Sequence, residues 1–180
     1  IKEELSDDIA QAKQDGGRVC IVHAAALHVN DSAKEVEETD MESSFKVQLI
    51  APALLNKEFI PILPRGSSVI FIGSTLSEKA VAGTFTYSTG KHALAGMMKA
   101  TAQDLFGSGI HTSLVCPGFT DTPMLREHIP DPEVLEALAK ANSFGRLVNP
   151  KEIADIVMNI EKSPALNGSI IHANLGQKEY

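Results

Sequence analysis

Short apolar runs alternate along this chain with segments of helical periodicity. Four runs have the β-branched, nearly uninterrupted character of strands that are buried on both faces: 18–25, 68–73, 110–116 and 169–173. Between and around them, helices are predicted over 2–14, 41–59, 87–106 and from about Pro150 to 161. Strand–helix alternation favours a parallel sheet with right-handed crossovers. We therefore expect one α/β domain over residues 1–180, with about four strands and flanking helices.

The connection 118–146 departs from this rhythm. It is long for a link between two elements, and prolines interrupt it, so we expect a loop with one short helix. Such a segment suits a lid over a substrate. Its apolar residues could line a substrate pocket or could simply pack that small helix: Met124, Leu125, Ile129, Val134 and Leu138.

Tyr87 and Lys91 are candidate catalytic residues. They are four residues apart and therefore share one face of the predicted helix. A nearby ammonium favours a phenolate, so we expect the pKa of Tyr87 to fall towards neutrality and the phenol to exchange protons. The pair alone is common on helix surfaces. Here, however, Ser74 and Pro117-Gly118 follow two predicted strands, and ligands bind beyond the carboxyl ends of such strands. This context favours a catalytic site for carbonyl–alcohol chemistry.

Several ordered segments now match one known family. They are Val-His-Ala-Ala-Ala at 22–26, Phe-Lys-Val-Gln-Leu at 45–49, Ser74, Tyr87 with Lys91, Pro-Gly-Phe-Thr-Asp-Thr at 117–122, and closing segments at 144–147, 150–154 and 167–171. In these features the chain resembles the short-chain dehydrogenase/reductase (SDR) family. The resemblance implies a Rossmann-like, doubly wound parallel sheet.

The resemblance also implies roles for individual residues. The catalytic positions are Ser74, Tyr87, Lys91 and Gln48, where Gln48 carries on a longer arm the amide of the family's asparagine. The implied cofactor-binding positions are Ala24, Ala25, Tyr87, Lys91, Pro117, Gly118, Thr120 and Thr122. The implied activity is an NAD(P)-dependent oxidoreductase that interconverts an alcohol and a ketone or aldehyde by hydride transfer.

The family's Gly-rich phosphate-binding turn has no match in this sequence. No Gly-x-x-x-Gly-x-Gly occurs, and Gly16-Gly17 precedes a strand instead of following one. We therefore expect an N-terminally truncated version of the fold, with NAD or NADP bound weakly or not at all by this chain alone. The alternative is a catalytically inactive SDR-like protein that serves as a binding or assembly module.

Composition and net charge limit the classes of partner that this chain can bind. A net charge of −7 argues against nucleic acid and anionic membranes, and no apolar run is long enough to span a bilayer. The histidines show no metal-ligand spacing, so no metal is expected, and Cys20 and Cys116 are typical of core thiols in a cytoplasmic protein. We expect a small alcohol or carbonyl substrate. The family resemblance further implies a homodimer or homotetramer built on helices 41–59 and 87–106. The strand 18–25 should form an exposed edge that another chain, the N-terminal helix 2–14 or a loop covers.

Overall fold

The computed structural model describes residues 2–177 and contains a four-stranded parallel sheet. Its order is β1-β2-β3-β4, with strands at Cys20–His23, Ser68–Ile72, His111–Pro117 and Ile170–Ala173. Each strand pairs with the one that precedes it in the chain, for example through Phe71 opposite Leu114 and Val115 opposite Ile171. The predicted parallel α/β sheet is thereby confirmed.

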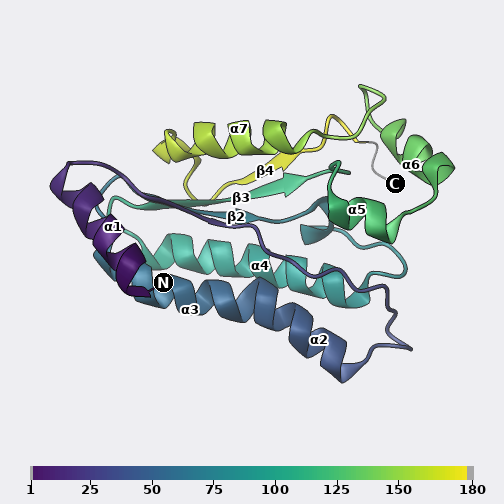
Figure 1. Cartoon of the computed structure of the whole chain (residues 1–180), viewed down its shortest axis with the longest axis horizontal. Coiled ribbons are helices and arrows are strands. Elements are labelled where there is room, and N and C mark those ends of the chain that lie inside the picture. Colours follow the sequence, from purple (N-terminus) through teal and green to yellow (C-terminus); the bar gives the residue numbers. More distant parts are fainter. Residues whose placement is uncertain (1, 178–180) are drawn as a thin grey trace.

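Helices cover both faces of the sheet. Their bounds are α1 Lys2–Gln14, α2 Glu38–Phe45, α3 Ala51–Phe59, α4 Phe85–Asp104, α5 Pro123–His128, α6 Pro132–Ala139 and α7 Pro150–Glu161. A π-helical turn, η1 Lys46–Ile50, joins α2 to α3, and 3-10 turns lie at η2 Ile60–Ile62, η3 Thr75–Ser77 and η4 Pro164–Leu166. Figure 1 shows α7 on one face of the sheet and α2, α3 and α4 on the other, so the sheet is doubly covered.

Two hydrophobic clusters fill the spaces between these layers. One side of the sheet packs Val69, Phe71 and Leu114 against Leu94 and Met98 of α4, with all five nearly or completely excluded from solvent. The other side packs Ile70 and Val115 against Val157 and Ile160 of α7. Burial on both faces explains the apolar runs at 69–72 in β2 and 114–116 in β3. The candidate site residues Ser74 and Gly118 follow these two buried strands.

The edge strand β1 is shorter than the sequence predicts, covering four residues where 18–25 was expected. It pairs on one side only, with β2, among the described residues. Val22 is 42% exposed, and Ala24 and Ala25 beyond it are exposed as well. Because β2 is the one strand that pairs with β1 among the described residues, the pairing ends at His23, after which the chain leaves the sheet. Helix α1 contacts the turn η2 that follows α3, and its Ile9 belongs to the same buried cluster as Phe59.

The helical boundaries differ from expectation in two further places. The single short helix predicted in 118–146 is two helices, α5 and α6, each begun by a proline and capped by Thr122 or Asp131. The predicted helix 41–59 begins earlier and contains the π-helical turn. Pro52 has no N–H and crowds the carbonyl of Gln48 one turn before it, and Ala51 N–H bonds the carbonyl of Lys46, five residues back.

Candidate active site

The sequence-predicted site residues meet at one edge of the sheet. Ser74 follows β2, Pro117 and Gly118 end β3, and Ala24 and Ala25 follow β1, so all lie at the carboxyl ends of parallel strands. Tyr87 and Lys91 come from the first turns of α4, which starts at that same end. Figure 1 shows α5 and α6 beyond the same ends of the strands. The structure therefore brings these residues to the place where such sheets bind ligands.

Ser74 caps the short turn that follows β2. The Ser74 Oγ accepts a hydrogen bond from Leu76 N–H at 3.1 Å, and Ser77 Oγ accepts one from Ser74 N–H at 3.1 Å, a reciprocal cap of the turn Thr75–Ser77. Because a backbone N–H occupies one lone pair of the Ser74 oxygen, the hydroxyl proton is left to donate. The Ser74 hydroxyl lies near enough to Tyr87 to favour the ionised form of that phenol.

The protonation of Tyr87 corrects the expectation from sequence. Burial raises the pKa of Tyr87 above its ordinary value, although the hydrogen bond from Ser74 opposes this rise. The prediction that Lys91 lowers this pKa is wrong for the structure: the Lys91 ammonium lies 5.4 Å from the ring centroid and donates to Ile72 O at 2.9 Å instead. Desolvation of a phenolate outweighs a cation at that distance. At neutral pH the site holds a protonated phenol.

Lys91 is a buried cation with no buried acid beside it. Its exposed fraction is 3%, and burial lowers its pKa to about 8. The Cys116 thiol, the one ionisable group that affects the pKa of Lys91, has its own pKa raised by burial and therefore carries no charge at neutral pH. Among the described residues, the hydrogen bond to Ile72 O is the only one found for the Lys91 ammonium. Two of its three donors therefore remain for a ligand.

Gln48 lies at the centre of the π-helical turn and is 1% exposed. Its Nε2 donates to Leu27 O at 3.3 Å and to Ser44 Oγ at 2.6 Å, while Oε1 has no partner among the described residues. A side chain at Gly90 would bring its Cβ within 3.2 Å of this amide nitrogen, so glycine lets α4 approach here. The structure places Gln48 against the loop after β1, and no hydrogen bond joins it to Lys91 among the described residues.

The remaining predicted cofactor positions line the same edge with their polar groups used locally. Gly118 N–H donates to Ala173 O at 3.1 Å. Thr120 Oγ1 donates to Gly118 O at 3.0 Å, and Thr122 Oγ1 accepts from Leu125 N–H at 3.3 Å as the cap of α5. These bonds fix the turn that leads into the lid segment.

Two histidines that sequence reasoning did not select also belong to this site. His28, in the loop after β1, stacks on Tyr87 with ring centroids 4.6 Å apart, and His128, at the end of α5, stacks on His28 at 4.0 Å. One signal in the sequence could have found His28. It follows a strand at the same edge of the sheet as Ser74, where polar loop residues tend to be functional.

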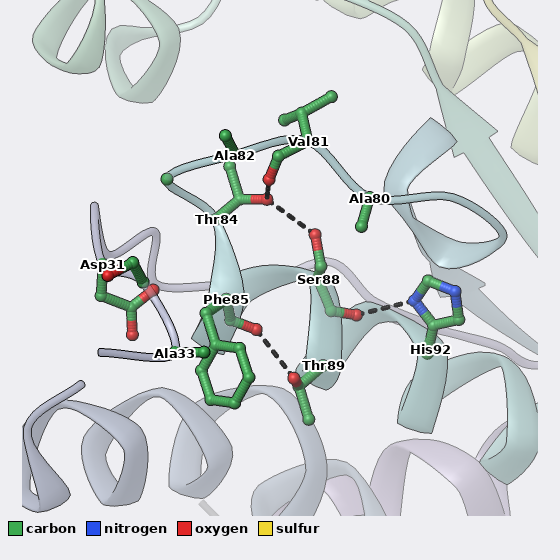
Figure 2. Close-up of a pocket in the computed structure, with 12 residues that line it drawn as sticks. Asp31, Ala33, Ala80, Val81, Ala82, Thr84, Phe85, Ser88, Thr89 and His92 are labelled. Atoms are coloured by element: carbon green, nitrogen blue, oxygen red, sulfur yellow. Dashed lines mark hydrogen bonds between the residues drawn. The ribbon is translucent and has the colours of Figure 1, made fainter. Parts of the chain in front are cut away.

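A cavity of about 540 Å³ lies beside the start of α4 (Figure 2). Figure 2 shows Thr84, Ser88 and His92 on its wall, and the Thr84 and Ser88 hydroxyls are 2.8 Å apart. None of Ser74, Tyr87 and Lys91 lines it. It is therefore separate from the redox chemistry suggested by those residues.

Two negative findings apply to the described part of the chain. Residues 2–177 contain no group of three or more histidine, cysteine or acidic side chains arranged to hold a metal ion. No helix among these residues is long and apolar enough to cross a membrane.

Comparisons with known proteins agree with this geometry. A sequence model of the family described as "Enoyl-(Acyl carrier protein) reductase" matches residues 2–178. "Dehydrogenase/reductase SDR family member 6" of Aquarana catesbeiana is 30% identical over 167 residues, which cover 88% of this chain and 68% of that protein.

Solved structures show the same architecture. The promiscuous reductase LugOII, described as catalysing keto-reduction at C1 during lugdunomycin biosynthesis, is 28% identical with a TM-score of 0.80, covering 97% of this chain and 72% of that one. The angucycline C-6 ketoreductase LanV with bound NADP matches with a TM-score of 0.82 at 24% identity, over 97% of this chain and 70% of that one. At that identity, LanV supports the fold alone.

Proposed function

Because this chain belongs to the short-chain dehydrogenase/reductase family of oxidoreductases, we propose that its Ser74–Tyr87–Lys91 site interconverts an alcohol and a ketone or aldehyde with NAD or NADP. One observation carries the proposal. The buried Lys91, which has no buried acid beside it, lies 5.4 Å from the ring of the partly buried Tyr87, whose pKa the Ser74 hydroxyl also affects. Such perturbed groups at a ligand-binding edge are typical of functional sites.

The donor set of this site fits a nicotinamide cofactor. Lys91 has two N–H donors to spare, which suits a pair of ribose hydroxyls. Ala24, Ala25, Pro117 and Gly118 offer small or flat surfaces at the same edge, and Thr120 and Thr122 begin the lid. The cofactor, when bound, supplies or accepts the hydride. The work of the protein is to orient the two reactants and to move the proton.

Proton transfer falls to Tyr87. Because burial keeps it as a phenol at neutral pH, Tyr87 is ready to donate its proton to a carbonyl oxygen that gains negative charge. Ser74 would donate its hydroxyl proton to the same oxygen, since Leu76 N–H occupies one of its lone pairs. Gln48 would act indirectly, by holding the loop after β1 through Leu27 O. This assignment favours the reduction of a carbonyl compound, as the description of LugOII states for that protein.

Replacing Tyr87 by Phe tests the proposal, because it removes one oxygen and leaves the packing intact. We expect turnover to fall about 10²–10⁴-fold, the contribution of general acid–base catalysis. The assay follows the absorbance of reduced nicotinamide with both cofactors over a panel of ketones and aldehydes. Thr89→Val is the control, since the Thr89 hydroxyl only bonds Phe85 O. A parent chain that turns over no substrate with either cofactor would support the non-catalytic binding module instead.

A further inference from the structure

Three aromatic rings form a row that leads from the phenol of Tyr87 to the lid. The rings of Tyr87 and His28 lie 4.6 Å apart and are inclined by 37°, and those of His28 and His128 lie 4.0 Å apart and are inclined by 44°. The three side chains come from α4, the loop after β1, and the end of α5. Close, tilted ring pairs of this kind stabilise one another beyond their burial. His28 is therefore the contact between Tyr87 and the lid.

His28 packs in this row as a neutral ring. Burial, and after it the electrostatic effect of His128, lowers its pKa to about 4, although Asp31 opposes both. The groups that face it are Tyr87 from α4, His128 from α5 and Asp31 from its own loop. Its Nδ1 is buried and has no partner among the described residues. At neutral pH His28 therefore offers Tyr87 a flat face and no positive charge.

The backbone on both sides of His28 is tied down. Before it, Leu27 O accepts from Gln48 Nε2 at 3.3 Å and from Ser44 Oγ at 3.4 Å. After it, Asp31 Oδ1 accepts from Thr86 N–H at 2.9 Å, one residue before Tyr87. Because the loop is held at Leu27 and at Asp31, the His28 ring has little freedom to change position. The bond at Asp31 attaches the loop to the first turn of α4.

Helix α5, by contrast, is loosely held. It spans six residues, and none of its described side chains is buried. Its cap, Thr122, and the ion pair of Arg126 with Asp121 are local to the segment. The ring stack of His128 on His28 is therefore a contact that docks this helix on the rest of the site.

We propose that His28 is a positioning residue: it holds the Tyr87 ring towards Ser74 and, through His128, makes that position depend on the docking of α5. The proposal rests on the proposed function, in which Tyr87 is the proton donor, and it adds a link between lid closure and the phenol. Docking of α5 would then shield Tyr87 from water and fix its orientation in one event.

The test uses Tyr87 as its own probe. The chain has two tyrosines and no tryptophan, so subtracting the fluorescence of Tyr87→Phe isolates the Tyr87 signal. Acrylamide quenching at neutral pH then reports how far solvent reaches that ring. We expect His28→Ala to raise the Tyr87 quenching constant about twofold or more, and His28→Phe to restore the parent value, because a flat ring is retained. His92→Ala, at an exposed histidine on α4, is the matched control and should leave quenching unchanged.

A double-mutant cycle separates positioning from simple packing. His128→Ala should also raise the quenching constant of Tyr87, although no ring contact joins the two among the described residues. It should add nothing in the His28→Ala background, since the link is already lost. Unchanged quenching in His28→Ala, or additive effects of the two substitutions, would overturn the proposal. Because no turnover is measured, an inactive parent chain would affect the proposed function without deciding this result.

Discussion

At the scale of single residues, Lys91, which we propose to be catalytic, is a buried charge that lowers the stability of the fold. Its pKa of about 8, against 10.5 when exposed, means that the folded protein holds the ammonium about 3 kcal/mol less favourably than water does at neutral pH. The cost applies in full below pH 8, where both states are charged. It declines between pH 8 and 10.5, where the unfolded chain binds more protons than the folded one.

We therefore expect Lys91→Met to stabilise the fold by about 1 to 2 kcal/mol at pH 7. The gain is smaller than 3 kcal/mol because Ile72 O loses its donor, which costs about 1 kcal/mol. Urea denaturation measures the difference, and the advantage should shrink when the measurement is repeated near pH 9.5. Lys99→Met, at an exposed position of the same helix, should change little. A less stable Lys91→Met at pH 7 would show that the ammonium is better compensated than its contacts indicate.

His28 gives a second prediction at this scale, in the acid range. Its folded pKa of about 4 lies below the ordinary 6.5, so the unfolded chain binds a proton first as the pH falls. Stability is lost from about pH 6.5 down to about 4. Since the ring is only half-buried, we expect a loss of about 1 to 2 kcal/mol between pH 7.5 and 5. Urea denaturation of the parent and of His28→Phe at pH 7.5 and at pH 5 isolates the loss of stability that is due to His28. An equal loss of stability in the two proteins would contradict this prediction.

Sequence reasoning located Ser74, Tyr87 and Lys91 because their spacing and the strand before them are local features. It gave the wrong direction for the pKa of Tyr87, because burial depends on packing against elements distant in the chain. It also missed His28 and His128, which are one hundred residues apart and meet only after folding. Local pattern predicts which groups are present, whereas protonation and ring contacts depend on the tertiary structure.

At the scale of elements, the π-helical turn Lys46–Ile50 is the feature that joins the fold to the site. Sequence periodicity predicted one continuous helix here, and Pro52 was its only irregularity. The wide turn was not predictable, because the hydrogen bonds of the Gln48 Nε2 to Leu27 O and Ser44 Oγ form only once the chain has folded. The strand–helix alternation and the parallel sheet, by contrast, were predictable from the apolar runs alone.

Replacing Gln48 by Ala should therefore act on two elements together. We expect a loss of about 2 to 3 kcal/mol, from a buried cavity and from hydrogen bonds without a donor. Hydrogen exchange should show faster exchange of loop amides near His28, because Leu27 O is no longer tied to the turn. Gln103→Ala, exposed on α4, is the matched control. Protection of that loop equal to the parent's would mean that Gln48 does not hold it.

At the scale of the whole molecule, an apolar surface on the α3 side remains open. Ile50, Leu54 and Leu55 are 51%, 55% and 43% exposed, and α4, which contacts the π-helical turn, also carries exposed small residues such as Ala93 and Gly96. The family resemblance implies that a second copy of this chain packs there. Grouped apolar side chains at a surface are commonly interface sites.

We predict that sedimentation equilibrium will find a dimer or a tetramer. Ile50→Glu combined with Leu54→Glu should shift it to a monomer, because burying two carboxylates in an apolar interface is unfavourable. Val134→Glu on α6, also at an exposed apolar residue, should leave the mass unchanged. A parent chain that sediments as a monomer would contradict this prediction directly.

The strand order β1-β2-β3-β4 has a consequence for how this protein is made. Because each strand docks on the one synthesised just before it, no strand has to be threaded between two others, and the sheet can grow outward from the ribosome. The first three strands and α4 already contain Ser74, Tyr87 and Lys91. Until α7 and β4 emerge, however, Ile70 and Val115 face water on the uncovered side. The nascent chain would thus carry most of the candidate site together with a bare apolar surface, to which a chaperone could bind.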